Sequence, residues 1–272
     1  GYTEASRGCK HLCRHCPIVP VYEGRFFVVS KEIVLADIRQ QVAVGAGHIS
    51  FGDPDFFNGP GHAVNIIKHL NREFPDLGYD VIIKIEHLLK HRDLLPVLKE
   101  TGCRFITTAV ESIDDDVLKK LEKGHTCAEF IEAVGIANGL ELVLSPTFIP
   151  FTPWTTVSGF KNLLQTIADL ALIDHIAPVQ LSIRLLIPEG SRLLEIEEIR
   201  TQALSFDNKA LSYPWKFSDP QIESLADKVA LIVEEGEHAQ KNRREIFSEI
   251  WTAANEANGM TKRQSNDFDA KG

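Results

Sequence analysis

Apolar residues recur at two different spacings along the first two thirds of the chain. Short apolar runs predict strands at 2–6, 48–51, 80–86, 103–110, 140–146 and 178–186. Between these runs, apolar residues at helical spacing predict helices at 33–46, 61–74, 88–101, 114–121, 128–137 and 156–172. Six strand-then-helix units predict an α/β fold with a parallel sheet and right-handed crossovers.

The pattern changes after about residue 187. Two amphipathic helices are predicted at 221–235 and 239–257, with apolar stripes that include Leu225, Val229, Ile232, Ile246 and Ile250. We therefore expect a strand-and-helix domain over 1–187 and a mostly helical C-terminal extension over 188–272. A doubly wound sheet and a partial barrel share this pattern, and both place their chemistry at the C-terminal ends of the strands.

Composition narrows the class of protein. The 272 residues are 44% hydrophobic and 25% charged, which is typical of a globular chain and not of a disordered one. The net charge of −9 argues against a nonspecific nucleic-acid binder, and no apolar run reaches the roughly 18–20 residues of a membrane helix. Because the chain begins with Gly1 and its one Met is Met260, we interpret it as an excerpt of a longer sequence.

The five cysteines are Cys9, Cys13, Cys16, Cys103 and Cys127. An odd count in an acidic chain is not typical of a disulfide framework, so we expect a reducing compartment, the cytoplasm. The first three fall within eight residues, which favours a soft metal centre. A zinc site would normally want a fourth ligand, here His11 or His15. Three thiolates also suit a 4Fe-4S cluster with one iron left open, since ordinary ferredoxin clusters use four cysteines.

The C-x3-C-x2-C spacing, on a loop after an N-terminal strand, resembles the signature of the radical S-adenosylmethionine (SAM) superfamily. The stretch VESIDDDVLKKLEKGHT is similar to the corresponding segment of many of its members. The resemblance implies an open, partial (β/α)6 TIM-like barrel. It also implies that the amino and carboxylate groups of SAM bind the open iron, and that the reduced cluster cleaves a carbon–sulfur bond. An external electron donor such as flavodoxin or ferredoxin and a small-molecule substrate are implied as well.

The second predicted strand is followed by Gly52, Asp53 and Pro54. By resemblance, these residues correspond to a Gly-rich segment that receives the amino group of SAM, because a backbone without side chains can approach it closely. The usual pattern is Gly-Gly-Glu, so the match is partial. A helix-entry turn, which Asp and Pro favour, is the alternative interpretation.

Further cofactor contacts are implied at the fourth strand and in the cysteine loop. Glu111 and Ser112 would face the ribose or amino acid part of SAM. Lys123 would meet its carboxylate, unless it is a solvated lysine at a helix end. His15, next to the last cysteine of the motif, would stack beside the adenine.

Arg184 is a charge within the sixth predicted strand and therefore needs a partner. A carboxylate of the cofactor or substrate would serve, and so would a structural salt bridge to Glu86 or Glu141. By resemblance, Leu185 would flank the adenine. Glu86 and His87 close the third predicted strand, either as acid–base groups or as residues that favour a helix start.

Several segments suggest a narrower branch of the superfamily. GCKHLCRHCP, HISFGDPDFFNGPGHA, IKIEHLLKH and QLSIRLLIPEGSRLL resemble a branch with a C-terminal cysteine or selenocysteine tail, which includes arsinothricin biosynthesis. That resemblance implies transfer of a 3-amino-3-carboxypropyl group to trivalent arsenic, with arsenite as substrate. The alternatives are a conventional 5′-deoxyadenosyl-radical enzyme and, from a different class, a noncatalytic iron–sulfur or zinc-binding protein.

Overall fold

The structure is a computed structural model that describes residues 1–257. Contacts along the chain define two compact units. The first contains residues 1–110 and 118–147, and the second contains residues 111–117 together with the chain from Phe148 onward. The boundary expected at residue 187 stays a prediction.

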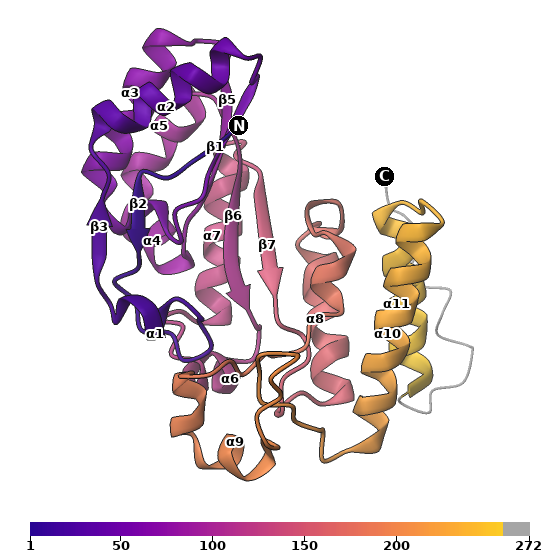
Figure 1. The fold of residues 1–272 in the computed structure, drawn as a ribbon. Coiled ribbons are helices and arrows are strands. Elements are labelled where there is room, and N and C mark those ends of the chain that lie inside the picture. The colour runs from indigo at the N-terminus through magenta and orange to yellow at the C-terminus, as the bar shows by residue number, and fades with distance from the viewer. Residues whose placement is uncertain (258–272) are drawn as a thin grey trace. The chain divides into compact units, whose positions relative to one another are not determined.

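A five-stranded sheet forms the centre of the first unit, in the order β1-β4-β5-β6-β7 (Figure 1). Its strands are β1 (Tyr2–Thr3), β4 (His48–Phe51), β5 (Gly78–Ile82), β6 (Cys103–Glu111) and β7 (Leu144–Phe148). The pairs β1–β4, β4–β5 and β5–β6 are parallel. Ile49, Val81 and Ile106 are completely buried, because helices and loops cover the sheet. The predicted α/β class with a parallel sheet is confirmed.

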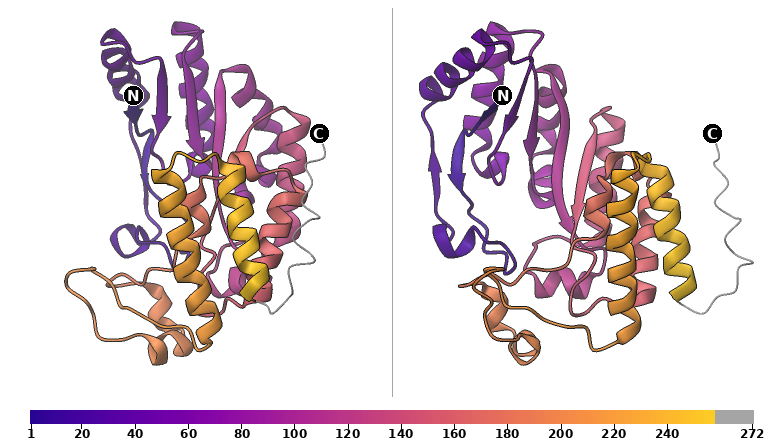
Figure 2. Two further views of the ribbon diagram at one scale, coloured as in Figure 1. Left: turned by 90° about the vertical axis from the view of Figure 1, so that its right-hand side faces the viewer. Right: turned by 45° about the vertical axis from the view of Figure 1, so that its right-hand side comes forward.

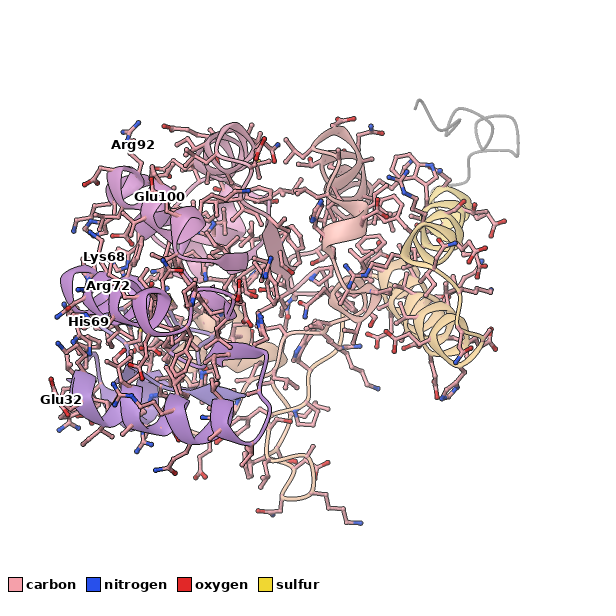
Figure 3. All side chains as sticks on the ribbon, turned by 90° about the horizontal axis from the view of Figure 1, so that it is seen from above. Glu32, Lys68, His69, Arg72, Arg92 and Glu100 are labelled. Carbon is pink, nitrogen blue, oxygen red and sulfur yellow. The ribbon has the colours of Figure 1, made fainter. Side chains whose placement is uncertain are left out.

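The helices of this unit are α1 (Val19–Tyr22), α2 (Lys31–Ala43), α3 (Pro60–Glu73), α4 (Ile85–Lys90), α5 (Leu95–Glu100) and α7 (Cys127–Gly139). Their apolar sides are buried, and their charged side chains point outward, as the labelled residues of Figure 3 show. Thr126 begins α7 with a capping box that includes Glu129, and α7 covers the helix predicted at 128–137.

Two local predictions in the first unit are wrong, and one element was not predicted. The strand expected at 80–86 ends at Ile82, since α4 begins at Ile85 and takes Glu86 and His87 into its first turn. The helix expected at 88–101 breaks into α4, a 3-10 turn at Arg92–Leu94 and α5, because Pro96 lacks an N–H and starts a new helix. An antiparallel ribbon of β2 (Ser6–Gly8) and β3 (Phe26–Val28) was not expected.

Three helices dominate the second unit: α8 (Val157–Asp169), α10 (Pro220–His238) and α11 (Arg243–Ala257). They pack side by side (Figure 2). The expected stripe residues Leu225, Val229, Ile246 and Ile250 are buried, and Gly236 allows Ile246 to approach the backbone of α10 closely. The shorter helices are 3-10 turns at Ile173–His175, Pro178–Leu181 and Arg192–Glu195, and α9 (Glu197–Gln202). The helix α6 (Asp115–Lys120) contains the point at which the chain leaves the second unit and returns to the first, between residues 117 and 118.

The sixth strand expected at 178–186 is not formed. Pro178–Leu181 is a 3-10 helix, and the segment keeps a single parallel bridge, between Phe151 and Arg184. Pro178 has no N–H to give to a strand ladder, which favours the turn. The part of the predicted extension from 258 to 272 lies outside the described residues. Within residues 1–257, every helix is too short or too polar to cross a bilayer.

Candidate metal centre

The three clustered cysteines lie on a loop between β2 and α1 in the first unit. All three thiols are free; Cys13 is buried, and Cys9 and Cys16 are half-buried. Arg14 ties the loop to the chain after α6, because its N–H donates to the carbonyl of Leu121 at 2.9 Å and its guanidinium contacts Glu122 at 2.9 Å. These contacts of Arg14 fix the part of the loop between Cys13 and Cys16 to the folded unit.

Asn58 holds the first half of the same loop. The Lys10 ammonium donates to the Asn58 carbonyl at 2.6 Å, and the Lys10 N–H donates to the Asn58 side-chain oxygen at 3.3 Å. The Cys9 thiol lies 3.9 Å from that oxygen. Asn58 is 2% exposed and ends the 3-10 turn Phe56–Asn58 after β4, so the turn positions Cys9.

Two buried lysines face the thiols. Lys84 is 6% exposed, and its Nζ lies 3.8 Å from the Cys13 sulfur. Burial raises the pKa of the Cys9 thiol and of the Cys16 thiol. The charge of Lys84 acts to lower the pKa of Cys9, and the charge of Lys123 acts to lower the pKa of Cys16. The charges of the other two thiols of the loop also raise the pKa of Cys16. Three thiols compensated by two cations fit a 4Fe-4S cluster, because the cluster takes its ligands as thiolates.

Lys123 itself is 3% exposed, so the interpretation as a solvated helix-end lysine is wrong. Its N–H donates to the carbonyl of Leu118 at 3.0 Å, and it follows Glu122, whose φ of 53° ends the preceding turn. His15 is half-buried in the loop. Both residues therefore share the first unit with the cysteines. Their contacts to SAM stay predictions.

Gly52 and Asp53 support the start of the sheet. The ring of Tyr2 occupies the place where a side chain at residue 52 would lie, and the Gly52 N–H donates to the Thr3 carbonyl at 2.8 Å. Asp53 is 1% exposed. Its carboxylate accepts a hydrogen bond from the Ala5 N–H at 2.8 Å and another from the Ser6 hydroxyl. Burial raises the pKa of the Asp53 carboxyl. Its two oxygens thus fasten the connection between β1 and β2, and the half-buried Pro54 follows.

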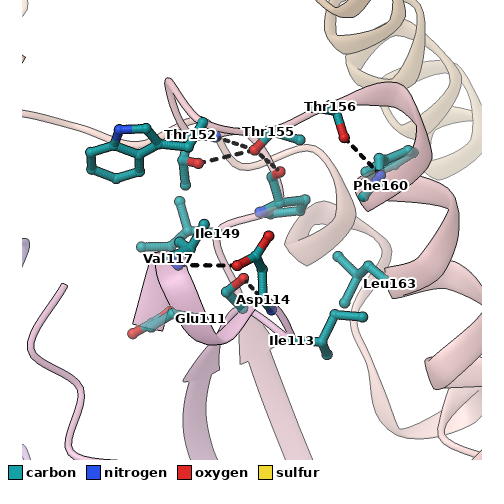
Figure 4. Close-up of a pocket in the computed structure, with 14 residues that line it drawn as sticks. Glu111, Ile113, Asp114, Val117, Ile149, Thr152, Thr155, Thr156, Phe160 and Leu163 are labelled. Atoms are coloured by element: carbon teal, nitrogen blue, oxygen red, sulfur yellow. Dashed lines mark hydrogen bonds between the residues drawn. The ribbon is translucent and has the colours of Figure 1, made fainter. Parts of the chain in front are cut away.

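Glu111 and Ser112 belong to the second unit, where they line a small pocket with Asp114, Ile149 and Thr152 (Figure 4). Glu111 is buried in a left-handed conformation with φ 68°, and its carbonyl accepts from the Ile149 N–H at 2.9 Å. The Ser112 hydroxyl accepts from the Asp114 N–H at 3.0 Å. The cavity of about 80 Å³ is too small to hold SAM by itself, since ligand pockets span about 300–1,000 Å³.

Arg184 has a structural partner, but not either of the expected ones. Its guanidinium forms a salt bridge with Glu223 at 2.6 Å, donates to the Trp215 carbonyl at 2.7 Å, and lies 4.2 Å from the centre of the Trp215 ring. The expectation of Glu86 or Glu141 as partner is therefore wrong. The hydrogen bond from Arg184 lowers the pKa of Glu223. Burial of the carboxyl has a smaller effect in the opposite direction. Leu185 is 2% exposed and bonds through its N–H to the Phe151 carbonyl.

Lys84 and Asn58 are the residues that the sequence interpretation missed. Lys84 interrupts the apolar run DVIIKIE. That is the same feature that singled out Arg184, so the pattern could have identified it. Asn58 gave no comparable indication, because its role depends on where the turn after β4 meets the cysteine loop.

A family model described as the Radical SAM superfamily matches residues 3–166. The chain belongs to the radical SAM superfamily. This family uses a 4Fe-4S cluster and SAM, which confirms the expected cofactors and agrees with the three free thiols of the loop.

The chain is similar to part of each of two curated relatives. The hopanoid C-3 methylase of Methylococcus capsulatus is 26% identical over 151 residues, which cover 56% of this chain and 29% of that protein. The ribosomal protein uS12 methylthiotransferase RimO of Porphyromonas gingivalis is 24% identical over 180 residues, 62% of this chain and 41% of that protein. The radical SAM chain thus spans well under half the length of these relatives.

Solved structures confirm the fold. The cobalamin-dependent SAM radical enzyme OxsB, with aqua-cobalamin and SAM bound, superimposes with a TM-score of 0.72 at 16% identity, over 86% of this chain and 41% of that one. The methyltransferase TsrM from Kitasatospora setae, with cobalamin and a [4Fe-4S] cluster bound, gives a TM-score of 0.52 at 17% identity, over 63% of this chain and 32% of that one. Both similarities support the TIM-like barrel class.

Proposed function

We propose that this chain contains the catalytic barrel of a radical SAM enzyme that transfers a carbon group from SAM to a small molecule. The observation that carries the proposal is the loop of three free thiols next to buried Lys84. When bound, a cluster with three protein thiolates offers one iron to SAM and supplies the electron that cleaves a carbon–sulfur bond. An external donor, a flavodoxin or ferredoxin, would deliver that electron.

The residues of the chain have distinct tasks in this proposal. Cys9, Cys13 and Cys16 hold the cluster, and Lys84 places a positive charge 3.8 Å from the Cys13 sulfur. Asn58 and the backbone carbonyl after α6 fix the loop so that the three sulfurs stay near one another. Cys13 is 6% exposed, which would limit the access of water to that side of a bound centre.

The remaining predicted cofactor residues contribute binding and orientation. Lys123 is the candidate cation for the SAM carboxylate, because it is buried near Cys16. Glu111 provides a buried carboxylate at the end of β6. Gly52 would contribute through its backbone carbonyl, since the Tyr2 ring fills the place of its side chain. His15, Pro54, Ser112, Arg184 and Leu185 complete the proposed set. Of these, Arg184 is the weakest candidate, since Glu223 already neutralises it.

The specific reaction that we propose is transfer of a 3-amino-3-carboxypropyl group to trivalent arsenic. Its support is the resemblance of four segments to the branch that includes arsinothricin biosynthesis. Trivalent arsenic is soft and prefers thiolate ligands. Cys103 does not suit that task, because burial raises its pKa to about 12. Cys127, half-buried at the start of α7, is the better candidate thiol.

Methyl transfer is the second candidate. It is favoured by the names of the relatives, which include a hopanoid C-3 methylase and the methyltransferase TsrM. Because OxsB and TsrM were solved with cobalamin, this candidate would require cobalamin as an additional cofactor.

Analysis of the products of SAM distinguishes these reactions. The anaerobically reconstituted full-length protein is reduced with dithionite beside SAM, with and without arsenite, and the products are identified by mass spectrometry. Methylthioadenosine that rises with arsenite, together with an arsenic–carbon product, supports the main proposal. S-adenosylhomocysteine that forms when cobalamin is added supports methyl transfer. 5′-Deoxyadenosine alone indicates the conventional reaction, and no cleavage of SAM on an intact cluster overturns all three.

A further inference from the structure

Two buried side chains and one half-buried side chain, from three separate elements, meet beside the cysteine loop in the first unit. His11 comes from the loop itself, Asp55 precedes the 3-10 turn Phe56–Asn58, and His87 lies in the first turn of α4. Their side chains are 18%, 0% and 9% exposed, respectively. One ligand atom from each lies within 4.8 Å of the other two.

The ligand atoms of these side chains lack hydrogen-bond partners. Nε2 of His11, Oδ2 of Asp55 and Nδ1 of His87 are buried, and none of them forms a hydrogen bond with any of residues 1–257. Nδ1 of His87 lies 2.7 Å from Oδ2 of Asp55, but their orientation is not that of a hydrogen bond. Buried polar atoms are nearly always paired, so three orphans at one point call for a common partner.

A cation is the partner that all three atoms can share. The Asp55 carboxylate is fully buried, and an isolated buried charge is costly unless an opposite charge compensates it. Its other oxygen accepts the Phe57 N–H at 3.2 Å, which fixes the carboxylate and leaves Oδ2 directed at the two imidazoles. A neutral molecule such as water would not compensate the charge.

We propose that His11, Asp55 and His87 bind one divalent first-row transition-metal ion, separate from the iron–sulfur cluster. Two imidazoles and a carboxylate are the donors that zinc and ferrous iron accept, with bonds of about 2.0–2.2 Å. Such bonds place neighbouring ligand atoms about 3.0–3.5 Å apart at the angles these metals adopt. The distances from Oδ2 of Asp55, 2.7 Å to His87 and 3.7 Å to His11, lie on either side of that range. The ring centres of His11 and His87 lie 4.9 Å apart, so the two imidazoles would move toward each other when they close on the ion.

The surroundings of His11 support the same assignment. Its other ring nitrogen, Nδ1, lies 3.6 Å from the carboxylate of Glu86. Metal-binding histidines commonly direct their second nitrogen to a carboxylate, which fixes the ring. Glu86 also lies 3.6 Å from Lys84, the lysine beside Cys13. The three protein ligands leave coordination positions open for water or a substrate oxygen.

Zinc is the probe for the test. The anaerobically reconstituted full-length protein is dialysed against micromolar zinc, and its iron and zinc are counted by elemental analysis. We expect about one zinc per chain in addition to about four iron atoms. Zinc X-ray absorption should show nitrogen and oxygen neighbours at about 2.0–2.1 Å with imidazole scattering. Sulfur neighbours at about 2.3 Å would place the zinc on the cysteines and overturn the proposal.

Variants distant from the cysteine motif locate the ion. Asp55→Asn and His87→Ala should each weaken zinc binding by at least about tenfold while iron stays near four per chain. His91→Ala is the matched control. The His91 ring lies 5.7 Å from the His87 ring, but His91 is not one of the three proposed zinc ligands, so this variant should keep the zinc. Wild-type protein that holds its full iron and takes up no zinc overturns the proposal without any variant. So does zinc that both ligand variants retain.

Discussion

Replacing Lys84 by Met would remove one buried positive charge from beside the cysteine loop and keep most of the side-chain volume. Lys84 is 6% exposed, and its Nζ lies 3.8 Å from the Cys13 sulfur. Adding an electron to a cluster makes it more negative, and a nearby cation stabilises that reduced form. The Lys84→Met variant should therefore have a more negative cluster reduction potential than the wild type.

The distance sets the size of the shift. At an effective dielectric constant of about 20, unit charges at that separation interact by about 4 kcal/mol, which is an upper bound. The added electron is spread over the cluster, and Glu86, 3.6 Å from Nζ, offsets part of the lysine charge. We therefore expect about 1–2 kcal/mol, which is about 40–90 mV for a one-electron couple.

A redox titration followed by electron paramagnetic resonance measures this potential in the reconstituted protein. Lys90→Met is the matched control, because Lys90 is an exposed lysine in the same helix, α4, and should leave the potential within about 10 mV. Iron content confirms that both variants carry the cluster. A Lys84→Met potential within about 20 mV of the wild type, with full iron, would refute the electrostatic role of Lys84.

Three further substitutions test other parts of the structure. Cys13→Ala should abolish iron binding and SAM cleavage together, whereas Cys103→Ala should keep both; an active Cys13→Ala protein would contradict the cluster assignment. Asp53→Ala should cost about 2–3 kcal/mol in urea unfolding, because two donors of the β1–β2 connection lose their acceptor. Glu223→Gln should cost about 1 kcal/mol at neutral pH after discounting for its partial exposure. Since the Arg184 contact lowers the Glu223 pKa, that difference should shrink as pH falls below about 4, and a pH-independent difference would refute it.

The sequence pattern predicted those elements whose periodicity is local. The strands at His48–Phe51 and Cys103–Glu111 and the helix started by Thr126 follow from apolar spacing and capping residues next to each other in the chain. The strand expected near Arg184 failed, because an apolar run does not reveal whether a neighbouring strand is available to pair with it. The pairing of β2 with β3 is also non-local, because the strands are joined by residues 9–25, which include the cysteine loop.

The candidate site shows the same limit at the level of side chains. Three cysteines within eight residues indicate a metal centre by themselves, because their chemistry and spacing are both local. Arg184 and Lys84 were equally visible as charges in apolar runs. Their partners, Glu223 and the Cys13 thiol, lie 39 and 71 residues away in the chain. A buried charge can therefore be recognised in a sequence, but its task depends on a contact that only the fold determines.

The same distinction separates the roles of half-buried Arg184 and buried Lys84. Arg184 is spent on the fold of the second unit, where a carboxylate and two aromatic rings saturate it. Lys84 contacts a thiol and a half-exposed carboxylate, which leaves much of its charge uncompensated within the first unit. A bound anionic centre would supply further compensation, since a buried charge without a full partner is costly. The position of Lys84 thus argues for the cluster independently of the cysteine spacing.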